Sequence, residues 1–340
     1  MKKYVFFLPR LVLLVALSLA FPAHSYSQSL ACPPNIDFEF GNFLLWSCEI
    51  GTAQNPPPST PPATVSFLNT APSVPTPGRH TITSAASGID AYGGFSQLAP
   101  LGGNYSLKLG NNVTGAQAEK VKYGLTVPVG INNYSFKFKY AVVFEDPGHA
   151  AVEQPRFEVN AYDAVTGLPV PCSQQSFVAA ASIPGFFTSP TNAGVRYKPW
   201  TDHIIVLGGT SGQSVYLEVA TGDCTLSGHF GYGYFDLIDC GQFQTAVATC
   251  DLDGQGIVLT GPAGYMTYTW YDASWNPVGT PTQTTTFHPT NTVAQAYHLV
   301  LTPFPTISTC LDTIDTQPIA NVDVQAQPDT SCITLGVPIQ

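Results

Sequence analysis

The segment from Ser227 to Cys240 places a carboxylate, Asp236, within a stripe of aromatic residues. As a β-strand, it would carry Tyr232, Tyr234 and Asp236 on one face, because side chains alternate between the two faces of a strand. A carboxylate in such a stripe is costly unless a cation or hydrogen-bond donors satisfy it. Glycines inside the same segment favour close approach of another group to the backbone. The segment therefore indicates a site as well as a core strand.

A second set of residues with possible chemistry consists of acids and histidines: Asp146, His149, His203, Asp223 and His229. Imidazoles beside carboxylates can bind a transition metal or transfer protons. The spacing of these residues matches no metal motif, however, and loop histidines commonly hydrogen-bond to the backbone. A structural role is the preferred interpretation, and a metal or acid/base site is the alternative.

Motifs of enzyme chemistry are absent from the sequence. It contains no Gly-x-Ser-x-Gly, no His-Glu-x-x-His and no phosphate-binding glycine loop. A pair of glycosidase carboxylates would leave no such motif, because its members are neighbours in space and not in sequence. We predict that the protein is not an enzyme.

Aromatic residues beside glycine or proline are candidates for ligand binding. Exposed rings of this kind present a flat, amphipathic surface on which a sugar ring can stack. Trp200, Tyr232 and Tyr234 are the candidates named here. Ordinary core packing is the alternative, and it is the more common role for any single aromatic residue of a β-sandwich.

The N-terminus has the layout of a secretory signal peptide over residues 1–27. Lys2 and Lys3 precede an apolar segment from Leu11 to Phe21, and small residues follow at Ala23 and Ser25. The apolar run is shorter than the roughly 20 residues of a membrane-spanning helix, so no transmembrane anchor is expected after cleavage. The net charge of −10 makes nucleic acid a poor partner. We expect a secreted or cell-surface protein.

Eight cysteines in an exported chain favour disulfides. Metal binding is less favoured because no pair has the Cys-x-x-Cys spacing of a zinc knuckle. The preferred pairs are Cys32 with Cys240, Cys172 with Cys224, and Cys250 with Cys310. Cys48 and Cys332 have no obvious partners.

Alternating apolar residues predict an all-β first domain over residues 28–241. The strongest pattern runs from Tyr134 to Phe144, and no stretch of the mature chain holds a helical period for three turns. Glycine and proline turns separate further short strands. Eight to ten strands over about 210 residues are typical of a jelly-roll β-sandwich.

A smaller second domain is predicted over residues 242–320. Its short strands and its core candidate Trp270 have the size and rhythm of an immunoglobulin-like β-sandwich. The two domains are expected to fold independently, each with its own disulfides. Ser331-Cys332 then repeats Thr249-Cys250, so residues 321–340 are interpreted as the start of a truncated further repeat, with more repeats of the same chain beyond residue 340. Chance similarity in a threonine-rich tail is the alternative.

Several motifs of the chain resemble two known families. The residues that resemble carbohydrate-binding-module jelly rolls are Phe38-Glu39-x-Gly41 with Trp46, Tyr105 to Leu109, and Tyr234-Phe235-Asp236, which would match opening, middle and closing strands. Residues that resemble the N-terminal module of large, secreted, gliding-motility-associated adhesins of Bacteroidetes are Asn35 to Trp46, Val142 to His149, Glu153 to Phe157, and Asp223-Cys224 with Gly228 to Tyr232. Those adhesins carry immunoglobulin-like or PKD-like repeats, which the region from Cys250 to Pro318 resembles more loosely.

The resemblance implies a calcium site and a function. In carbohydrate-binding jelly rolls a structural Ca²⁺ commonly ties the first strand to the last, and the matching acidic residues are Glu39 and Asp236. The alternative is that Asp236 caps a turn and Glu39 is solvated. The implied function is non-catalytic adhesion to an extracellular glycan or surface. The alternative is the binding-module portion of a secreted polysaccharide-active enzyme.

Overall fold

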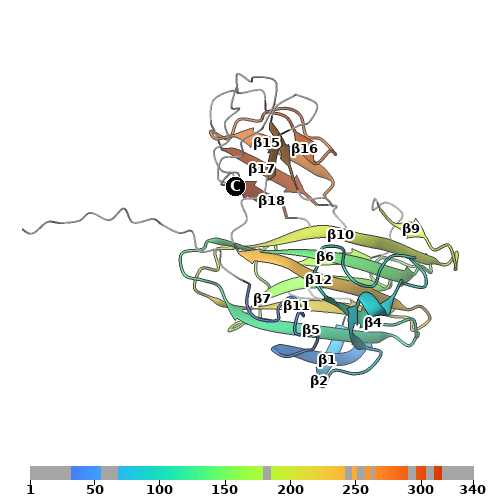
Figure 1. The fold of residues 1–340 in the computed structure, drawn as a ribbon. Coiled ribbons are helices and arrows are strands. Elements are labelled where there is room, and N and C mark those ends of the chain that lie inside the picture. The colour runs from blue at the N-terminus through green and yellow to red at the C-terminus, as the bar shows by residue number, and fades with distance from the viewer. Residues whose placement is uncertain are drawn as a thin grey trace, which may run out of the picture. The chain divides into compact units, whose positions relative to one another are not determined.

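The computed structural model describes residues 32–54, 68–178, 185–241, 247–250, 257–261, 265–289, 296–303 and 310–315. The regular structure of this part of the chain consists of antiparallel β-sheets, and its one helix is the single 3-10 turn η1 (Ala85–Ser87) (Figure 1). No helix within these residues has the length and apolarity needed to cross a membrane. The predicted signal peptide (1–27) and truncated repeat (321–340) lie outside the described residues, so both remain predictions.

Two six-stranded sheets form the first sandwich. One sheet has the order β2 (Leu68–Ser73), β1 (Trp46–Ala53), β5 (Gln117–Thr126), β11 (Ser214–Gly222), β7 (Arg156–Asp163) and β8 (Gln175–Val178). The other has the order β3 (His80–Ser84), β4 (Tyr105–Gly110), β12 (Gly231–Gly241), β6 (Asn133–Glu145), β10 (Val195–Gly208) and β9 (Phe187–Thr188). The predicted all-β sandwich is confirmed.

The alternating pattern explains which faces meet in the core. Phe136 and Phe138 of β6, Phe235 of β12 and Phe157 of β7 are all buried in one cluster between the sheets. On the same inner face of β12 a Cβ at Gly233 would lie 2.3 Å from a ring carbon of Phe157. Glycine is needed there because the phenylalanine ring of the facing sheet packs directly on the backbone. The opposite face of β12 carries Asp236, so this strand has two distinct surfaces.

Two three-stranded sheets follow. One contains β13 (Val247–Cys250), β14 (Ile257–Thr260) and β16 (Thr286–Phe287), and the other β15 (Thr267–Asp272), β17 (Tyr297–Thr302) and β18 (Asp312–Asp315). Trp270 is buried with Leu259 and Leu299, as the sequence predicted for the second core. The boundary predicted at residues 241/242 adjoins residues 242–246, outside the described ranges, so the domain limits stay predictions.

The opening of the chain differs from the expectation that residues around Phe38 form the first strand. Residues 34–45 form consecutive turns, and the first strand begins at Trp46. Asn35 explains the turns: its side-chain amide donates to the carbonyl oxygens of Asn42 and Leu44, and its Oδ1 accepts from the backbone N–H of Phe40. These side-chain bonds replace a strand ladder, as asparagine does in turns.

The disulfides agree with one predicted pair and correct the others. Cys32 is bonded to Cys240, the predicted pair, and ties the start of the sandwich to the end of β12. Cys172 is bonded to Cys310, so the pairs Cys172 with Cys224 and Cys250 with Cys310 are wrong. Cys224 and Cys48 are buried free thiols. Spacing could not reveal this pairing, because it depends on which loops lie together after folding.

Candidate functional site

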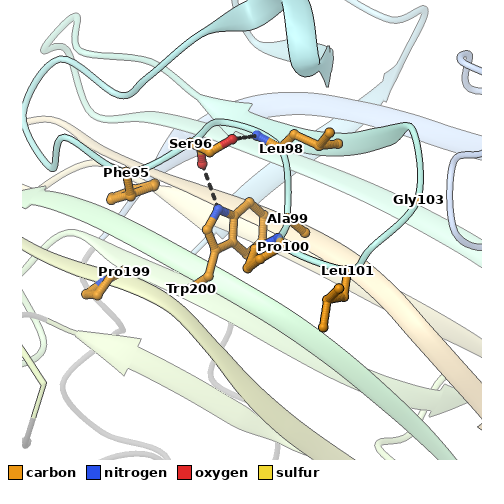
Figure 2. A pocket seen from close by; sticks show the side chains of 9 residues that line it. All are labelled: Phe95, Ser96, Leu98, Ala99, Pro100, Leu101, Gly103, Pro199 and Trp200. Atoms are coloured by element: carbon orange, nitrogen blue, oxygen red, sulfur yellow. Dashed lines mark hydrogen bonds between the residues drawn. The ribbon is translucent and has the colours of Figure 1, made fainter.

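A pocket of about 570 Å³ lies on the outer face of the sheet that contains β12. Its lining residues come from the β3–β4 connection and from β10: Phe95, Ser96, Leu98, Ala99, Pro100, Leu101, Gly103, Pro199 and Trp200. Figure 2 shows the indole of Trp200 lying among Ser96, Pro100 and Leu101. Trp200 is only partly buried, and Leu101 is 97% exposed. The pocket is therefore an open, mainly apolar hollow with a tryptophan in its wall.

A bulge in β10 places Trp200 at the pocket. The register of β10 against β6 shifts between Lys198 and Thr201, so Pro199 and Trp200 have no paired residue in β6. Proline has no N–H to donate to a ladder, and bulges commonly re-aim a side chain beside a site. The indole N–H donates to the carbonyl oxygen of Ser96 at 2.7 Å, which fixes the ring against the β3–β4 connection.

The carboxylate of Asp90 clamps the β3–β4 connection onto the sheet. Its Oδ1 accepts the backbone N–H groups of Tyr92 and Gly93 at 2.9 and 2.7 Å. Its Oδ2 accepts the hydroxyls of Tyr232 and Tyr234, both at 2.8 Å. Four donors on one buried carboxylate make a strong local network. This network anchors the segment that forms most of the pocket wall.

The predicted stacking role of Tyr232 and Tyr234 is wrong. The two residues are 2% and 0% exposed, because the connection held by Asp90 covers their face of β12. Their rings pack with Phe230 and Phe95, and the Lys108 ammonium lies 4.3 Å from the centre of the Tyr232 ring. Of the three predicted aromatic residues, Trp200 alone lines the pocket.

Glu39 and Asp236 hold the loop at the rim of the pocket from two sides. A Cβ at Gly102 would lie 2.2 Å from Asp236 Oδ2, and a Cβ at Gly103 would lie 2.3 Å from Glu39 Oε1. Glu39 Oε1 accepts the backbone N–H groups of Asn104 and Tyr105 at 2.8 and 3.0 Å. The two predicted carboxylates, Glu39 and Asp236, thus approach neighbouring residues of one loop. The segment that carries Glu39 was expected to pair with β12, but β4 occupies that position.

Asp236 lacks full compensation for a negative charge. Ser106 Oγ donates to its Oδ2 at 2.9 Å, while its Oδ1 is buried without a hydrogen-bond partner among the described residues. The pKa of this carboxyl is raised to about 9, mainly by burial; the Ser106 hydrogen bond opposes the rise, and the negative charges of Glu39 and Asp37 contribute to it. Such a carboxyl is stable in the fold when it holds a proton or faces a cation.

The structure separates the predicted set of acids and histidines. Asp223 accepts the backbone N–H groups of Gln117 and Gly231 at 2.8 and 3.0 Å, and Asp146 accepts the amide of Gln154 at 2.9 Å. His203 is buried in an aromatic cluster, where burial lowers its pKa to about 3. His149 and His229 alone lie together, with their ring centres 5.2 Å apart. The acids therefore have structural roles.

The sequence reasoning missed most of the pocket wall. Phe95 and Leu101 were not among the candidates, since the β3–β4 connection has no periodicity that places its side chains. One signal was available: Pro199 interrupts an alternating strand pattern, and an interior proline marks a bulge.

No family model matches this chain, and no curated protein matches it. Solved structures that resemble it include a carbohydrate-binding module (TmCBM61) in complex with β-1,4-galactotriose, at 9% identity and TM-score 0.30, covering 62% of this chain and 96% of that one. A structure described under carbohydrate-binding modules of the β-sandwich superfamily matches at 10% identity and TM-score 0.29, over 63% of this chain and 61% of that one. The adhesin domain of Epf from Streptococcus pyogenes matches at 9% identity and TM-score 0.21, over 63% and 76%. At these values the function has to be argued from the site.

Proposed function

We propose that this chain is an exported, non-catalytic, adhesin-like protein that binds an extracellular glycan through the pocket around Trp200. It would act in adhesion at the cell surface, as in the gliding-motility-associated proteins whose motifs it resembles. The observation that carries the proposal is the partly exposed indole of Trp200, held in an open pocket by its hydrogen bond to Ser96.

The chemistry of the pocket wall supports binding over catalysis. None of its nine lining residues, all within the described ranges, carries an ionisable group. The wall combines Phe95, Leu101, two prolines and the indole with a few backbone polar groups, a composition typical of ligand pockets. A sugar ring has an apolar face that suits the indole and hydroxyls that suit backbone N–H and C=O groups.

We also propose that Glu39 and Asp236 bind a structural Ca²⁺. The fit rests on the buried Oδ1 of Asp236, which has no described partner, and on the approach of both carboxylates to Gly102 and Gly103. Calcium prefers hard oxygen ligands, and backbone carbonyls can complete its shell. The ion would neutralise the two carboxylates and so support the loop at the rim of the pocket.

Glycan-array binding of the full chain, followed by titration of any glycan that binds, tests the main proposal. A tryptophan at the centre of a small interface commonly contributes about 2 kcal/mol or more, so Trp200→Ala should weaken binding roughly 30-fold. Trp275→Ala is the matched control, because Trp275 is 51% exposed and lies outside the pocket, and it should bind as the wild type does.

Three outcomes would contradict the proposal. One is the absence of any glycan ligand, and another is equal binding by wild type and Trp200→Ala. The third is progressive cleavage of a bound polysaccharide that a single carboxylate substitution abolishes, which would favour the polysaccharide-active enzyme.

A further inference from the structure

Two loops at one end of the first sandwich bring two histidines and a free thiol together. His149 lies in the connection between β6 and β7, while Cys224 and His229 lie in the turn between β11 and β12. Their ligand atoms all lie within 4.8 Å of one another. It is the one group of three or more such residues among those described. None of the three residues lines the pocket around Trp200.

Backbone hydrogen bonds hold the two loops in place. Cys224 donates its N–H to the carbonyl oxygen of His229 at 3.0 Å and so closes the β11–β12 turn. Thr225 donates to the carbonyl oxygen of Glu153 at 3.2 Å, which joins this turn to the β6–β7 connection. The side-chain amide of Gln154 donates to the carbonyl oxygen of His149 at 3.3 Å. The three side chains are therefore carried by a connected framework.

The distances suit coordination of a small metal ion. Cys224 Sγ lies 3.4 Å from His149 Nδ1. A sulfur and a nitrogen bound tetrahedrally to zinc at ordinary bond lengths are about 3.6 Å apart. The His149 and His229 rings are nearly perpendicular, at 83°, so they do not stack and can approach one ion from different directions.

One of the three side chains has a buried nitrogen without a hydrogen-bond partner, and another is a thiol that forms no disulfide. His229 Nδ1 is buried and has no hydrogen-bond partner among the described residues. Cys224 is buried and forms no disulfide; its sulfur accepts the backbone N–H of Leu226 and lies within hydrogen-bond distance of His149 Nδ1, both at 3.4 Å. A buried nitrogen without a hydrogen-bond partner is costly. An ion between these atoms would account for both features.

We propose that His149, Cys224 and His229 form a transition-metal site, with Zn²⁺ as the preferred ion. One thiolate and two imidazoles are borderline-soft ligands that suit zinc or copper and not calcium. Asp223, the neighbour of Cys224 in the sequence, does not belong to this group of close ligand atoms. Three protein ligands leave a fourth position open. Binding would release the thiol proton and cross-link the two loops.

Titration of the purified, metal-stripped full chain with Co²⁺ tests the proposal. Thiolate ligation gives a sulfur-to-cobalt charge-transfer band in the near ultraviolet, and tetrahedral geometry gives intense visible bands. We expect both bands with one equivalent of Co²⁺, displacement by Zn²⁺, and no effect of a large excess of Ca²⁺. Cys224→Ser should remove the charge-transfer band, and His149→Gln should weaken Co²⁺ binding at least 10-fold.

Matched variants distinguish this site from the rest of the chain. Cys48→Ala removes the other described free thiol, and Asp236→Asn removes the proposed calcium ligand, so both should keep the cobalt spectrum. If Cys224→Ser does not fold, the rate of alkylation of the wild type gives the second readout: the buried Cys224 reacts with iodoacetamide only when its loops open, so Zn²⁺ should slow its alkylation and leave that of Cys48 unchanged. A cobalt spectrum without a thiolate band, a band that persists in folded Cys224→Ser, or a disulfide at Cys224 would overturn the proposal.

Discussion

At the scale of single residues, Asp236 links the proposed calcium ion to the pocket. Ser106 Oγ donates to Asp236 and accepts the backbone N–H of Ala99 at 3.0 Å, and Ala99 is part of the pocket wall. A change of charge at Asp236 is therefore transmitted to the loop through one hydroxyl. Because burial disfavours the charged carboxylate, the loop depends on whether a cation or a proton compensates it.

Calcium removal should lower the melting temperature of the wild type. An ion that binds only the folded state stabilises it by about 2.7 kcal/mol at a hundredfold excess over its dissociation constant, which corresponds to roughly 5–10 °C for a domain of this size. Asp236→Asn and Glu39→Ala should each abolish the sensitivity to chelator in a calorimetric melt. Asp202→Asn, which removes an ion pair with Lys139, is the control that keeps it. Identical wild-type melts in chelator and in millimolar calcium would contradict the site.

His203 should make the protein sensitive to acid. Both its ring nitrogens are buried without hydrogen-bond partners among the described residues, and rings of Phe138 and Tyr265 surround it. Burial lowers its pKa from 6.5 to about 3, so the folded state keeps it neutral while the unfolded chain binds a proton as pH falls below 6.5. The free energy of unfolding is therefore highest above pH 6.5. It decreases as the pH falls toward 3, by up to about 1.4 kcal/mol per pH unit.

His203→Phe removes this titration and keeps an aromatic ring in the cluster. We expect urea unfolding at several pH values to show that the unfolding free energy of the variant rises steadily, relative to that of the wild type, as the pH falls from 6.5 to 4. A difference in unfolding free energy that stays constant over this interval would refute the assignment. His80, whose pKa burial also lowers, is present in both proteins and cancels in the comparison.

At the scale of elements, β12 separates a core face from a site face. On its inner face Gly233 admits Phe157 from the opposite sheet, whereas its outer face carries the tyrosines under the β3–β4 connection and then Asp236. The strand thus supports both the interior and the pocket wall. A substitution on one face of β12 that leaves the strand folded should therefore not disturb the core or the pocket wall on the other face.

Gly233→Ala tests the inner face. The added methyl would meet a Phe157 ring carbon at 2.3 Å, and overpacking of this kind costs about 1–3 kcal/mol. Gly124→Ala is the matched control in β5, because a Cβ there meets nothing within 4 Å, and its unfolding free energy should be unchanged or slightly higher. Equal stability of the two variants in urea unfolding would contradict the packing described here.

The elements were predictable from sequence to different degrees. The alternation from Tyr134 to Phe144 corresponds to β6 (Asn133–Glu145), because a strand buried in a sandwich imposes a period of two on its sequence. The β3–β4 connection has no such period, and its cover over Tyr232 and Tyr234 depends on the single carboxylate of Asp90. For that reason the sequence indicated aromatic candidates but could not tell the buried tyrosines from the partly exposed Trp200.

At the scale of the whole molecule, the described residues contain two disulfides with different roles. Cys32–Cys240 closes the first sandwich on itself, whereas Cys172–Cys310 joins the β7–β8 connection to the segment before β18. Tyr265 adds a second connection, since its hydroxyl donates to the carbonyl oxygen of Ile204 in β10 at 3.2 Å and its ring stacks on His203. The expectation that each sandwich has its own disulfides is therefore wrong.

Loss of the second disulfide should loosen the C-terminal strands selectively. A cross-link that spans 138 residues restricts the unfolded chain, and its removal typically costs about 2–5 kcal/mol. Cys310→Ser should therefore raise hydrogen exchange in β15, β17 and β18, while β6 and β12, which belong to the other core, keep their protection. Cys172→Ser should give the same effect, and the double variant should add nothing, because both single variants remove one bond. Unchanged exchange in β15 and β17, or peptide mapping that finds Cys172 bonded to Cys224, would contradict this connection between the sandwiches.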